Sequence, residues 1–191
     1  MRINTLEGPI VNPWNNNSII AYHGSTLNAL KRYAPEEGAF LNHFTVQLKH
    51  CSATTDFGRG FYLTTSLKQA QSWANLRVEK SPKKDQGLVL QYELDRNWLA
   101  SLEGTEFVRP CKNYWSFVTF CRTGKRTHKR QGSQRSYDYV AGPLSLFPQP
   151  FIIQDCDQYS FNTKDACEAL PKPLVSHFAK TSNHGRFIIH D

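Results

Sequence analysis

The apolar and polar positions along the chain predict short strands, several of which border glycine-containing turns. An apolar run at 18–22 continues into His23-Gly24-Ser25, so we expect a strand that ends at these three residues. The turn at 56–60 contains two glycines and precedes a second strand at 61–64. Alternating apolar residues predict a further strand over 88–94.

Helical signals follow the second strand. Ser66 and Gln69 have the spacing of a capping box, which marks the start of a helix. The apolar residues after them recur at helical spacing and predict one buried face, with Trp73 on the inner side: Leu67, Ala70, Trp73, Ala74 and Val78. Segment 114–121 fits a helix or a strand, because periodicity alone does not decide between them.

The rest of the chain adds short strands and one more helix. Strands are expected at 137–141, 151–153, 158–161 and 187–189, and a helix is expected from Asn162 or Thr163 to Leu170. Short strands with a few helices between them indicate an α+β fold built on antiparallel sheets rather than on alternating βαβ units. No internal repeat or linker divides the chain, so residues 1–191 are expected to form a single domain.

Composition agrees with a globular domain. Hydrophobic residues make up 39% of the chain and charged residues 20%, which excludes disordered, collagen-like and low-complexity classes. No apolar stretch approaches the roughly 18 residues of a membrane helix, and the N-terminal residues lack the apolar segment of a cleaved signal peptide. We therefore expect a cytosolic monomer that does not enter membranes.

The positive charge is concentrated in one segment. The net charge is +7, and six basic residues without an acidic neighbour lie between 122 and 135: Arg122, Lys125, Arg126, Lys129, Arg130 and Arg135. Removing these six from the 23 basic residues leaves 17 against 16 acidic ones. The segment is expected to be an exposed loop, with docking to an acidic surface or to nucleic acid as the alternatives.

The cysteines do not predict a metal site or a disulfide framework. Five are scattered along the chain, no C-x-x-C pair occurs, and none is spaced with the seven histidines as zinc ligands are. We expect small, buried, reduced cysteines and no bound metal.

Three segments carry candidate chemistry. They are His23-Gly24-Ser25 at a strand end, the Gly58–Tyr62 turn and strand with Trp73 eleven residues after the tyrosine, and Gln158 at the start of a late strand. Neither a Gly-x-Ser-x-Gly nucleophile elbow nor a phosphate loop ending in Gly-Lys-Ser/Thr is present, which argues against hydrolase and P-loop chemistry.

In this order and spacing the segments resemble the ADP-ribosyltransferase superfamily, in the histidine–tyrosine branch that includes poly-ADP-ribose polymerases and diphtheria toxin. The chain is still more similar to a family of that superfamily whose members include bacterial effectors that ADP-ribosylate ubiquitin on threonine. The similarity runs from residue 20 to about 170 and rests on five segments: Tyr22-His-Gly-Ser25, 56–65, Gln69-Ala-Gln-Ser-Trp-Ala74, Tyr137-Asp-Tyr-Val140 and Gln158-Tyr-Ser-Phe-Asn-Thr163.

The resemblance implies two packed antiparallel sheets that hold NAD⁺, the co-substrate, in a cleft between them. His23 and Tyr62 would come from neighbouring strands, and Gln158 would face them across the cleft. The cofactor-binding residues would be His23, Gly24, Ser25, Arg59, Gly60, Tyr62 and Trp73, and the catalytic residues would be His23, Tyr62 and Gln158.

The implied roles follow from side-chain chemistry. His23 would bond an adenosine ribose hydroxyl, Ser25 the carboxamide or a nearby ribose oxygen, and Arg59 would reach the pyrophosphate. Gly24 would let main-chain groups approach the carboxamide, while Tyr62 and Trp73 would stack on the nicotinamide ring.

Gln158 departs from the best-known members, where glutamate often stands at this position. A glutamine forms the ribose hydrogen bond but supplies neither charge nor a general base, and Asp56, Asp138 or the target protein would have to provide the base. The leading expectation is mono-ADP-ribosyl transfer to a host protein, ubiquitin on threonine first. A catalytically weak NAD⁺-binding pseudoenzyme and modification of nucleic acid through 122–135 are the alternatives.

The acceptor expectation also uses the residue two positions before Gln158. Arginine-modifying relatives usually have a glutamate there, whereas this chain has Cys156, which does not orient a guanidinium. An effector of this kind would enter the host cell without a cleaved signal peptide.

Overall fold

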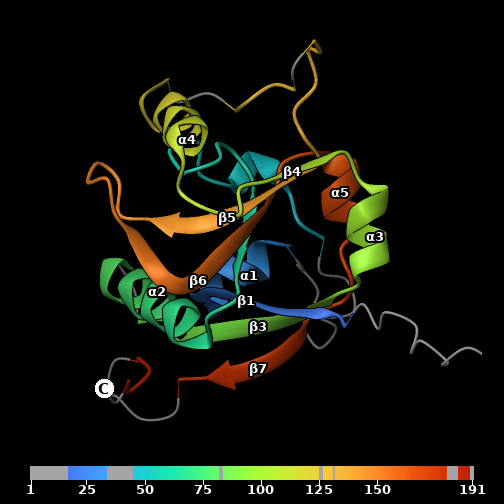
Figure 1. Cartoon of the computed structure of the whole chain (residues 1–191). Helices are drawn as coiled ribbons and strands as arrows, with labels where there is room; N and C mark the ends of the chain where they lie inside the picture. Colours follow the sequence, from blue (N-terminus) through green and yellow to red (C-terminus); the bar gives the residue numbers. More distant parts are fainter. Residues whose placement is uncertain are drawn as a thin grey trace, which may run out of the picture.

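A computed structural model describes residues 17–33, 45–81, 84–124, 127–130, 132–179 and 185–189 of the chain. Figure 1 shows a twisted sheet with helices packed around it. In chain order the elements are β1 (Ile19–Thr26), α1 (Leu27–Leu30), η1 (Lys31–Tyr33), η2 (Leu48–His50), β2 (Phe61–Thr64), α2 (Leu67–Lys80), β3 (Gly87–Leu94), α3 (Arg96–Ser101), β4 (Gly104–Glu106), α4 (Lys112–Gly124), β5 (Tyr139–Ser145), β6 (Ile152–Phe161), α5 (Lys164–Glu168) and β7 (Leu174–Phe178).

The strands form one seven-stranded sheet in the order β4-β5-β6-β2-β1-β3-β7. Every neighbouring pair is antiparallel except β4 and β5, which run parallel. The α+β class is therefore confirmed, whereas the structure has a single mixed sheet in place of the expected two packed sheets. The physical reason is that β2 pairs on both sides, with β6 and with β1, and so joins the two halves.

The junction between β1 and β2 is much shorter than the other central pairings. β1 pairs with β3 at all eight of its residues, from Ile19 to Thr26, and β2 pairs with β6 at all four of its residues. Between β1 and β2 the register contains one pair, Tyr22 with Thr64. The sheet is thus continuous but narrowly connected at its centre, directly before His23.

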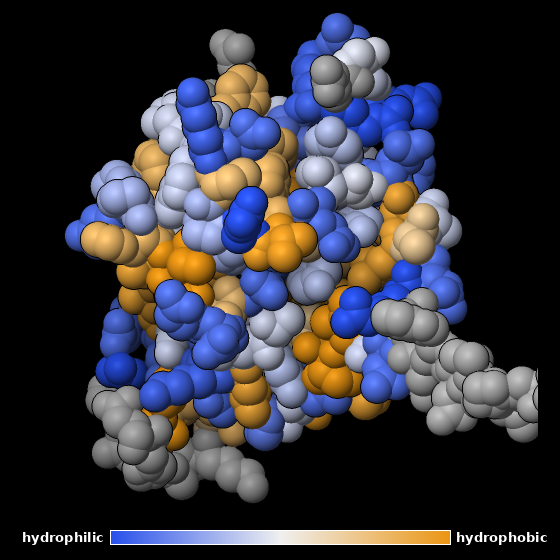
Figure 2. All heavy atoms as spheres, viewed as in Figure 1, coloured by the Kyte–Doolittle hydropathy of each residue, from blue (hydrophilic) through white to orange (hydrophobic). Residues whose placement is uncertain are grey.

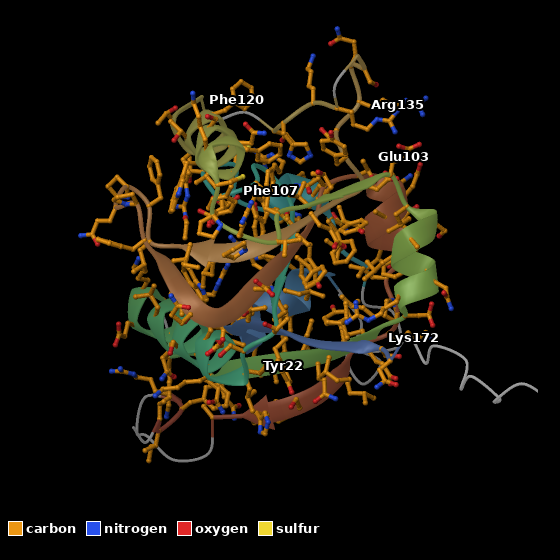
Figure 3. All side chains as sticks on the ribbon, in the orientation of Figure 1. Tyr22, Glu103, Phe107, Phe120, Arg135 and Lys172 are labelled. Carbon is orange, nitrogen blue, oxygen red and sulfur yellow. The ribbon has the colours of Figure 1, made fainter. Side chains whose placement is uncertain are left out.

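Alternate residues of the central strands enter two separate hydrophobic clusters. The larger cluster contains Phe61 and Leu63 of β2 and lies against α1, α3 and α5. The smaller one contains Phe57, Val140 and two residues of α4, with Tyr62 packed against it. Consecutive side chains of β2 therefore lie on opposite faces of the sheet, and α4 covers the face to which Tyr62 points. Figure 3 shows Phe107 between α4 and the sheet, where its ring contacts those of Tyr114 and Phe117.

Helix α2 covers the same face as α4, farther along the sheet. Ser66 caps the helix by accepting from Gln69 N at 3.2 Å, as the capping box predicts. The helix packs so closely on β1 that a Cβ at Gly24 would lie 1.8 Å from the carbonyl oxygen of Ala70. Gly24 is therefore required by packing of the helix against the strand.

Several local predictions are confirmed and others are wrong. Segment 114–121 is helical, within α4, and the helix near the C-terminus is capped by Thr163 but ends at Glu168. Segments 151–153 and 158–161 belong to one strand, β6, which is bent where Asp155 has a φ of 51°. Residues 187–189 form no strand, and β7 was not expected.

In the described part of the chain, no helix is both long and apolar enough to cross a membrane. On the face shown in Figure 2, hydrophobic residues form separate groups that hydrophilic residues divide.

Candidate functional site

The side chain of His23 lies at the point where β1 and β2 part. Its Nδ1 atom is 2.8 Å from the carbonyl oxygen of Tyr62, and its ring stacks on Phe61 with 4.3 Å between the ring centroids. A carbonyl oxygen only accepts, so Nδ1 carries the proton and Nε2 is an acceptor. His23 and Tyr62 come from neighbouring strands, as expected.

Burial and the charge of Arg77 lower the pKa of His23 to about 4, against the raising effect of the bond to Tyr62. The imidazole is consequently neutral at physiological pH. A neutral ring with a fixed tautomer presents one acceptor atom, which suits a hydroxyl donor such as a ribose hydroxyl.

The phenol of Tyr62 is held by the turn that precedes its own strand. Its hydroxyl donates to Gly58 O at 2.9 Å and accepts from Phe57 N at 2.8 Å. Burial raises the pKa of Tyr62, so the phenol is neutral. Because its ring lies on the α4 side while the His23 ring lies against Phe61, the two side chains are on opposite faces of the sheet.

Gln158 lies on β6, the strand next to β2, on the same face as Tyr62. Thr64 pairs with Gln158 and Tyr62 pairs with Ser160, and paired residues of an antiparallel ladder share a face. Gln158 therefore lies in the strand that is paired with the strand of Tyr62, within the same sheet. The expected arrangement, with Gln158 on a second sheet across a cleft, differs from this because β2 and β6 are hydrogen-bonded to one another along all of β2.

The amide of Gln158 is buried in a polar network that centres on Asp56. Its Nε2 donates to Asp56 Oδ2 at 2.6 Å and to Pro143 O at 3.1 Å. Both partners only accept, which fixes the amide nitrogen on their side and leaves Oε1 as the acceptor. Sequence reasoning named Asp56 as a possible base but did not anticipate this contact, since the two residues are 102 positions apart.

Asp56 is itself almost fully buried, at 1% exposure, and its carboxylate contacts donors of Arg122, Ser145 and Gln158. Arg122 of α4 holds Oδ1 through Nε at 2.7 Å and Nη2 at 2.5 Å, and Ser145 N donates to Oδ2 at 3.1 Å. The arginine fork and two further donors compensate the burial of this carboxylate.

Arg59 and Gly60 have structural roles in the same turn. Nη1 of Arg59 donates to three main-chain carbonyls, at 2.6 Å to Cys51 O and at 3.3 to 3.4 Å to those of Leu48 and Lys49. This guanidinium therefore links the 56–60 turn to η2 by hydrogen bonds. A Cβ at Gly60 would lie 2.2 Å from the Ser160 hydroxyl, so the turn approaches β6 only with glycine there.

Two of the other expected ligand residues are buried and one is exposed. Gly24 is covered by α2, and Ser25 is buried on β1. Trp73 is 45% exposed, so the expected burial of this residue on the inner helix face is wrong. Ala70, Ala74 and Val78 of the same helix are buried, and these smaller side chains form its inner face.

The basic segment is only partly an exposed loop. Arg122 belongs to α4 and Arg130 pairs with Glu103 at 2.6 Å. His128 is buried: Nδ1 lies 2.8 Å from Phe57 O, and Nε2 accepts from Tyr137 N at 3.1 Å. These contacts anchor the segment to the 56–60 turn. Lys125 and Arg126 lie outside the described residues.

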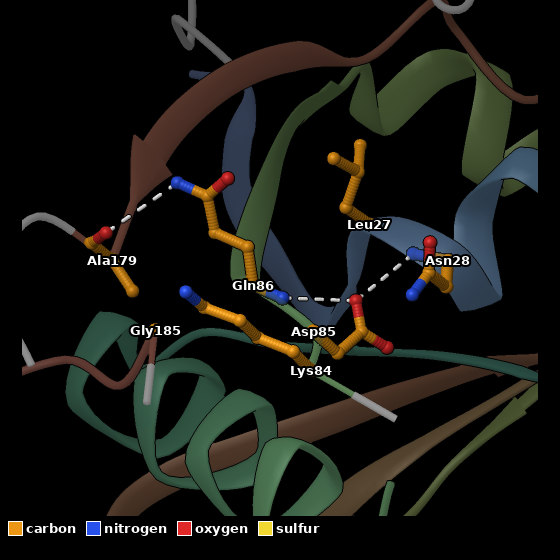
Figure 4. A pocket seen from close by; sticks show the side chains of 7 residues that line it. All are labelled: Leu27, Asn28, Lys84, Asp85, Gln86, Ala179 and Gly185. Atoms are coloured by element: carbon orange, nitrogen blue, oxygen red, sulfur yellow. Dashed lines mark hydrogen bonds between the residues drawn. The ribbon is translucent and has the colours of Figure 1, made fainter. Parts of the chain in front are cut away.

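A cavity of about 650 Å³ lies away from these residues, beside the start of β3 (Figure 4). Two of its polar side chains are already paired: Asp85 Oδ1 accepts from Asn28 N and Gln86 N, and Gln86 Nε2 donates to Ala179 O. A second cavity, of about 610 Å³, is lined by α4 residues that include Trp115 and Phe120. Neither contains His23, Tyr62 or Gln158.

Among the described residues, no three His, Cys, Asp or Glu side chains gather in a way that could hold a metal ion. All five cysteines are free thiols. Cys121, Cys156 and Cys167 are buried, as expected, whereas Cys111 is exposed. Cys156 lies against Thr64, with 3.2 Å between Sγ and Oγ1.

The fold and the site together define an α+β protein with one mixed sheet and a buried carboxylate–amide network beside its central strands. Residues 38–146 match a family model described as "Protein of unknown function (DUF3990)". This span is more than half of the 191 residues, and the chain belongs to that family. The match contains Asp56, Tyr62 and Arg122 but neither His23 nor Gln158. A search of curated proteins finds no match.

Proposed function

We propose that this protein transfers ADP-ribose from NAD⁺ to a protein side chain. The observation that carries the proposal is the arrangement of the three motif segments on adjacent strands. His23 of β1 is hydrogen-bonded to Tyr62 of β2, and β2 is paired with the β6 strand that carries Gln158. Segments that are far apart in the chain thus meet at the narrow junction of the sheet.

The acceptor atoms beside the sheet junction suit the sugar parts of NAD⁺. Ribose hydroxyls are donors; the neutral His23 ring offers Nε2 on one face of the sheet, and the Gln158 amide offers Oε1 on the other. Trp73, being exposed on α2, retains a ring face for stacking on a planar base. Arg59 is the residue that fits least, because a pyrophosphate would have to compete with three carbonyls for its guanidinium.

The reaction breaks the bond between ribose C1′ and the nicotinamide nitrogen, and the bonding electrons leave with nicotinamide. The acceptor hydroxyl oxygen then bonds to C1′, and its proton passes to water. Positive charge develops on the ribose in between, so acceptors that hold its hydroxyls and a nearby carboxylate lower the barrier. NAD⁺ is consumed as a co-substrate in this scheme.

For the acceptor we propose threonine of ubiquitin in the cytosol of a host cell, as in the effectors that the chain resembles. Cys156 supports an acceptor other than arginine. Its side chain is 4% exposed and bonded to Thr64, so it is not placed to orient a guanidinium.

The test is incubation of the purified protein with NAD⁺ and ubiquitin, read by intact mass. We expect ubiquitin to gain one ADP-ribose mass, and Trp73→Ala to slow this gain by about tenfold at limiting NAD⁺ while the variant stays folded. In a parallel incubation with NAD⁺ and cell lysate, labelling of another protein while ubiquitin stays unchanged would refute the acceptor and keep the reaction. Labelling of nucleic acid instead would refute protein transfer.

An NAD⁺-binding pseudoenzyme is the second candidate, and Gln158 favours it. The amide donates both its hydrogen bonds to buried protein atoms and carries no charge. Calorimetric binding of NAD⁺ without release of nicotinamide under any tested condition would select this candidate over the transferase.

A further inference from the structure

The buried contact between Asp56 and Gln158 bears on how the glutamine amide is oriented in the site. Gln158 is 4% exposed and Asp56 is 1% exposed, so the contact is shielded from water. The 2.6 Å distance between Nε2 and Oδ2 is short for a hydrogen bond to a carboxylate. Without a partner that only accepts, a glutamine amide could turn over and present its nitrogen in place of its oxygen.

We propose that Asp56 is the positioning residue for Gln158. Together with Pro143 O, its carboxylate holds the amide in one orientation, with Oε1 left to accept a ligand hydroxyl, and its charge acts on the site through the amide. This inference rests on the proposed function for the identity of that ligand, a ribose hydroxyl. Asp56 touches no ligand itself, because it is enclosed by Arg122, Ser145 and Gln158.

The proposal makes a specific prediction for the variant Gln158→Glu. A glutamate here would place two carboxylates in hydrogen-bond contact, and one of them must then hold a proton. The protonated glutamate would donate to Asp56 as the amide does, so the variant would resemble wild type only at low pH. As pH rises the shared proton is lost and the two charges repel. Because the folded variant retains this shared proton at a pH where the unfolded variant has lost it, the stability of the variant falls with rising pH.

The other titratable groups near Asp56 and Gln158 would not produce a loss of stability between pH 5 and pH 8. Arg122 and Cys121 face Asp56 from α4, together with Tyr114, and Tyr62 faces it from β2. Burial raises the pKa of Tyr62 and Tyr114 and raises that of Cys121 to about 12. Burial lowers the pKa of His23, which is bonded to Tyr62 O, and of His128, which is bonded to Phe57 O; both make the protein less stable as pH falls, which is the opposite direction.

The first experiment measures urea unfolding of wild type, Gln158→Glu and the double variant Asp56→Asn/Gln158→Glu at pH 5 and pH 8. Relative to wild type, the single variant should lose stability between these pH values by about tenfold or more in the unfolding equilibrium constant. The double variant has no second carboxylate and should lose this dependence. A single variant that is equally stable at both pH values, or more stable at pH 8, overturns the proposal.

The second experiment measures nicotinamide release by Asp56→Asn. The carboxamide oxygen of the introduced asparagine can still accept from the Gln158 amide, so the KM for NAD⁺ should change less than about threefold, while loss of charge lowers kcat by about tenfold. The matched control is Asp95→Asn, an exposed residue whose carboxylate caps α3 by accepting from Trp98 N and which should leave kcat unchanged. Wild-type kcat in Asp56→Asn, or an equal loss in the control, overturns the charge role.

The two experiments separate this inference from the proposed function. If wild type neither releases nicotinamide nor binds NAD⁺ while Gln158→Glu shows the pH-dependent unfolding, the transferase assignment fails and the Asp56–Gln158 coupling stands. If wild type is active and the unfolding data show no coupling, the positioning role fails alone.

Discussion

Acidification should weaken the fold through His23. In the folded protein burial lowers the pKa of His23 to about 4, whereas a histidine in an unfolded chain has a value near 6.5. Between these values the unfolded chain binds a proton that the folded protein does not. Stability that is present at neutral pH is therefore lost as pH falls below 6.5 toward 4.

The magnitude follows from the gap between the two pKa values. The full difference corresponds to about 3 kcal/mol at pH below 4, and about 2 kcal/mol of it is lost between pH 7 and pH 5. The structural cause is specific: protonation would put a charge on a ring that stacks on Phe61 and is hydrogen-bonded to the Tyr62 carbonyl. His128 shifts in the same direction and adds to the wild-type loss.

The assay is urea unfolding at pH 7 and pH 5 for wild type and His23→Asn. The variant should lose about 2 kcal/mol less than wild type over this interval. The control, His177→Asn on the edge strand β7, removes a histidine that lies away from Phe61 and Tyr62 and should retain the wild-type loss. Equal losses in wild type and His23→Asn, or an imidazole ¹⁵N spectrum with the proton on Nε2, would refute the reasoning.

Three further predictions concern the helix that follows the Tyr62 strand. Gly24→Ala should destabilise the protein by about 3 kcal/mol or more in thermal unfolding, because the new Cβ meets the main chain of Ala70 at 1.8 Å; a change below about 1 kcal/mol would mean that α2 moves freely. Ser66→Ala should cost about 1 kcal/mol and speed amide exchange at Gln69, and unchanged exchange there would exclude the cap. Trp73→Ala should lower NAD⁺ affinity by about tenfold with less than about 1 kcal/mol lost in unfolding, whereas a large loss of stability with unchanged affinity would make the residue a packing residue.

Local sequence patterns were sufficient to predict the strand and the helix next to the candidate site. The capping pair Ser66 and Gln69 and the apolar spacing after it predicted α2 closely, because a helix start depends on residues within one turn. The strand before it has the predicted bounds, Phe61–Thr64. The same periodicity misplaced Trp73, since spacing defines a face of a helix but not how far a neighbouring element extends over it.

Long-range pairing explains what sequence patterns did not predict. The one pair between Tyr22 and Thr64 joins the halves of the sheet, and no local residue pattern encodes it. The contact of Asp56 with Gln158 likewise depends on the approach of the 56–60 turn to β6. Because side chains alternate along a strand, the sequence predicts that Tyr22 and His23 lie on opposite faces of the sheet. It does not predict that His23 lies on the face of Phe61, which depends on long-range packing.

The pairing of β2 with β6 has a consequence for synthesis of the chain. Thr64 leaves the ribosome 94 residues before its partner Gln158, which at common elongation rates is a delay of roughly 5 to 20 s. During that interval Phe61 and Leu63, which are almost fully buried in the finished protein, have no partner strand on the β6 side. Nascent chains of this length should therefore be substrates for ribosome-associated chaperones, and chains released before Phe161 should aggregate rather than fold.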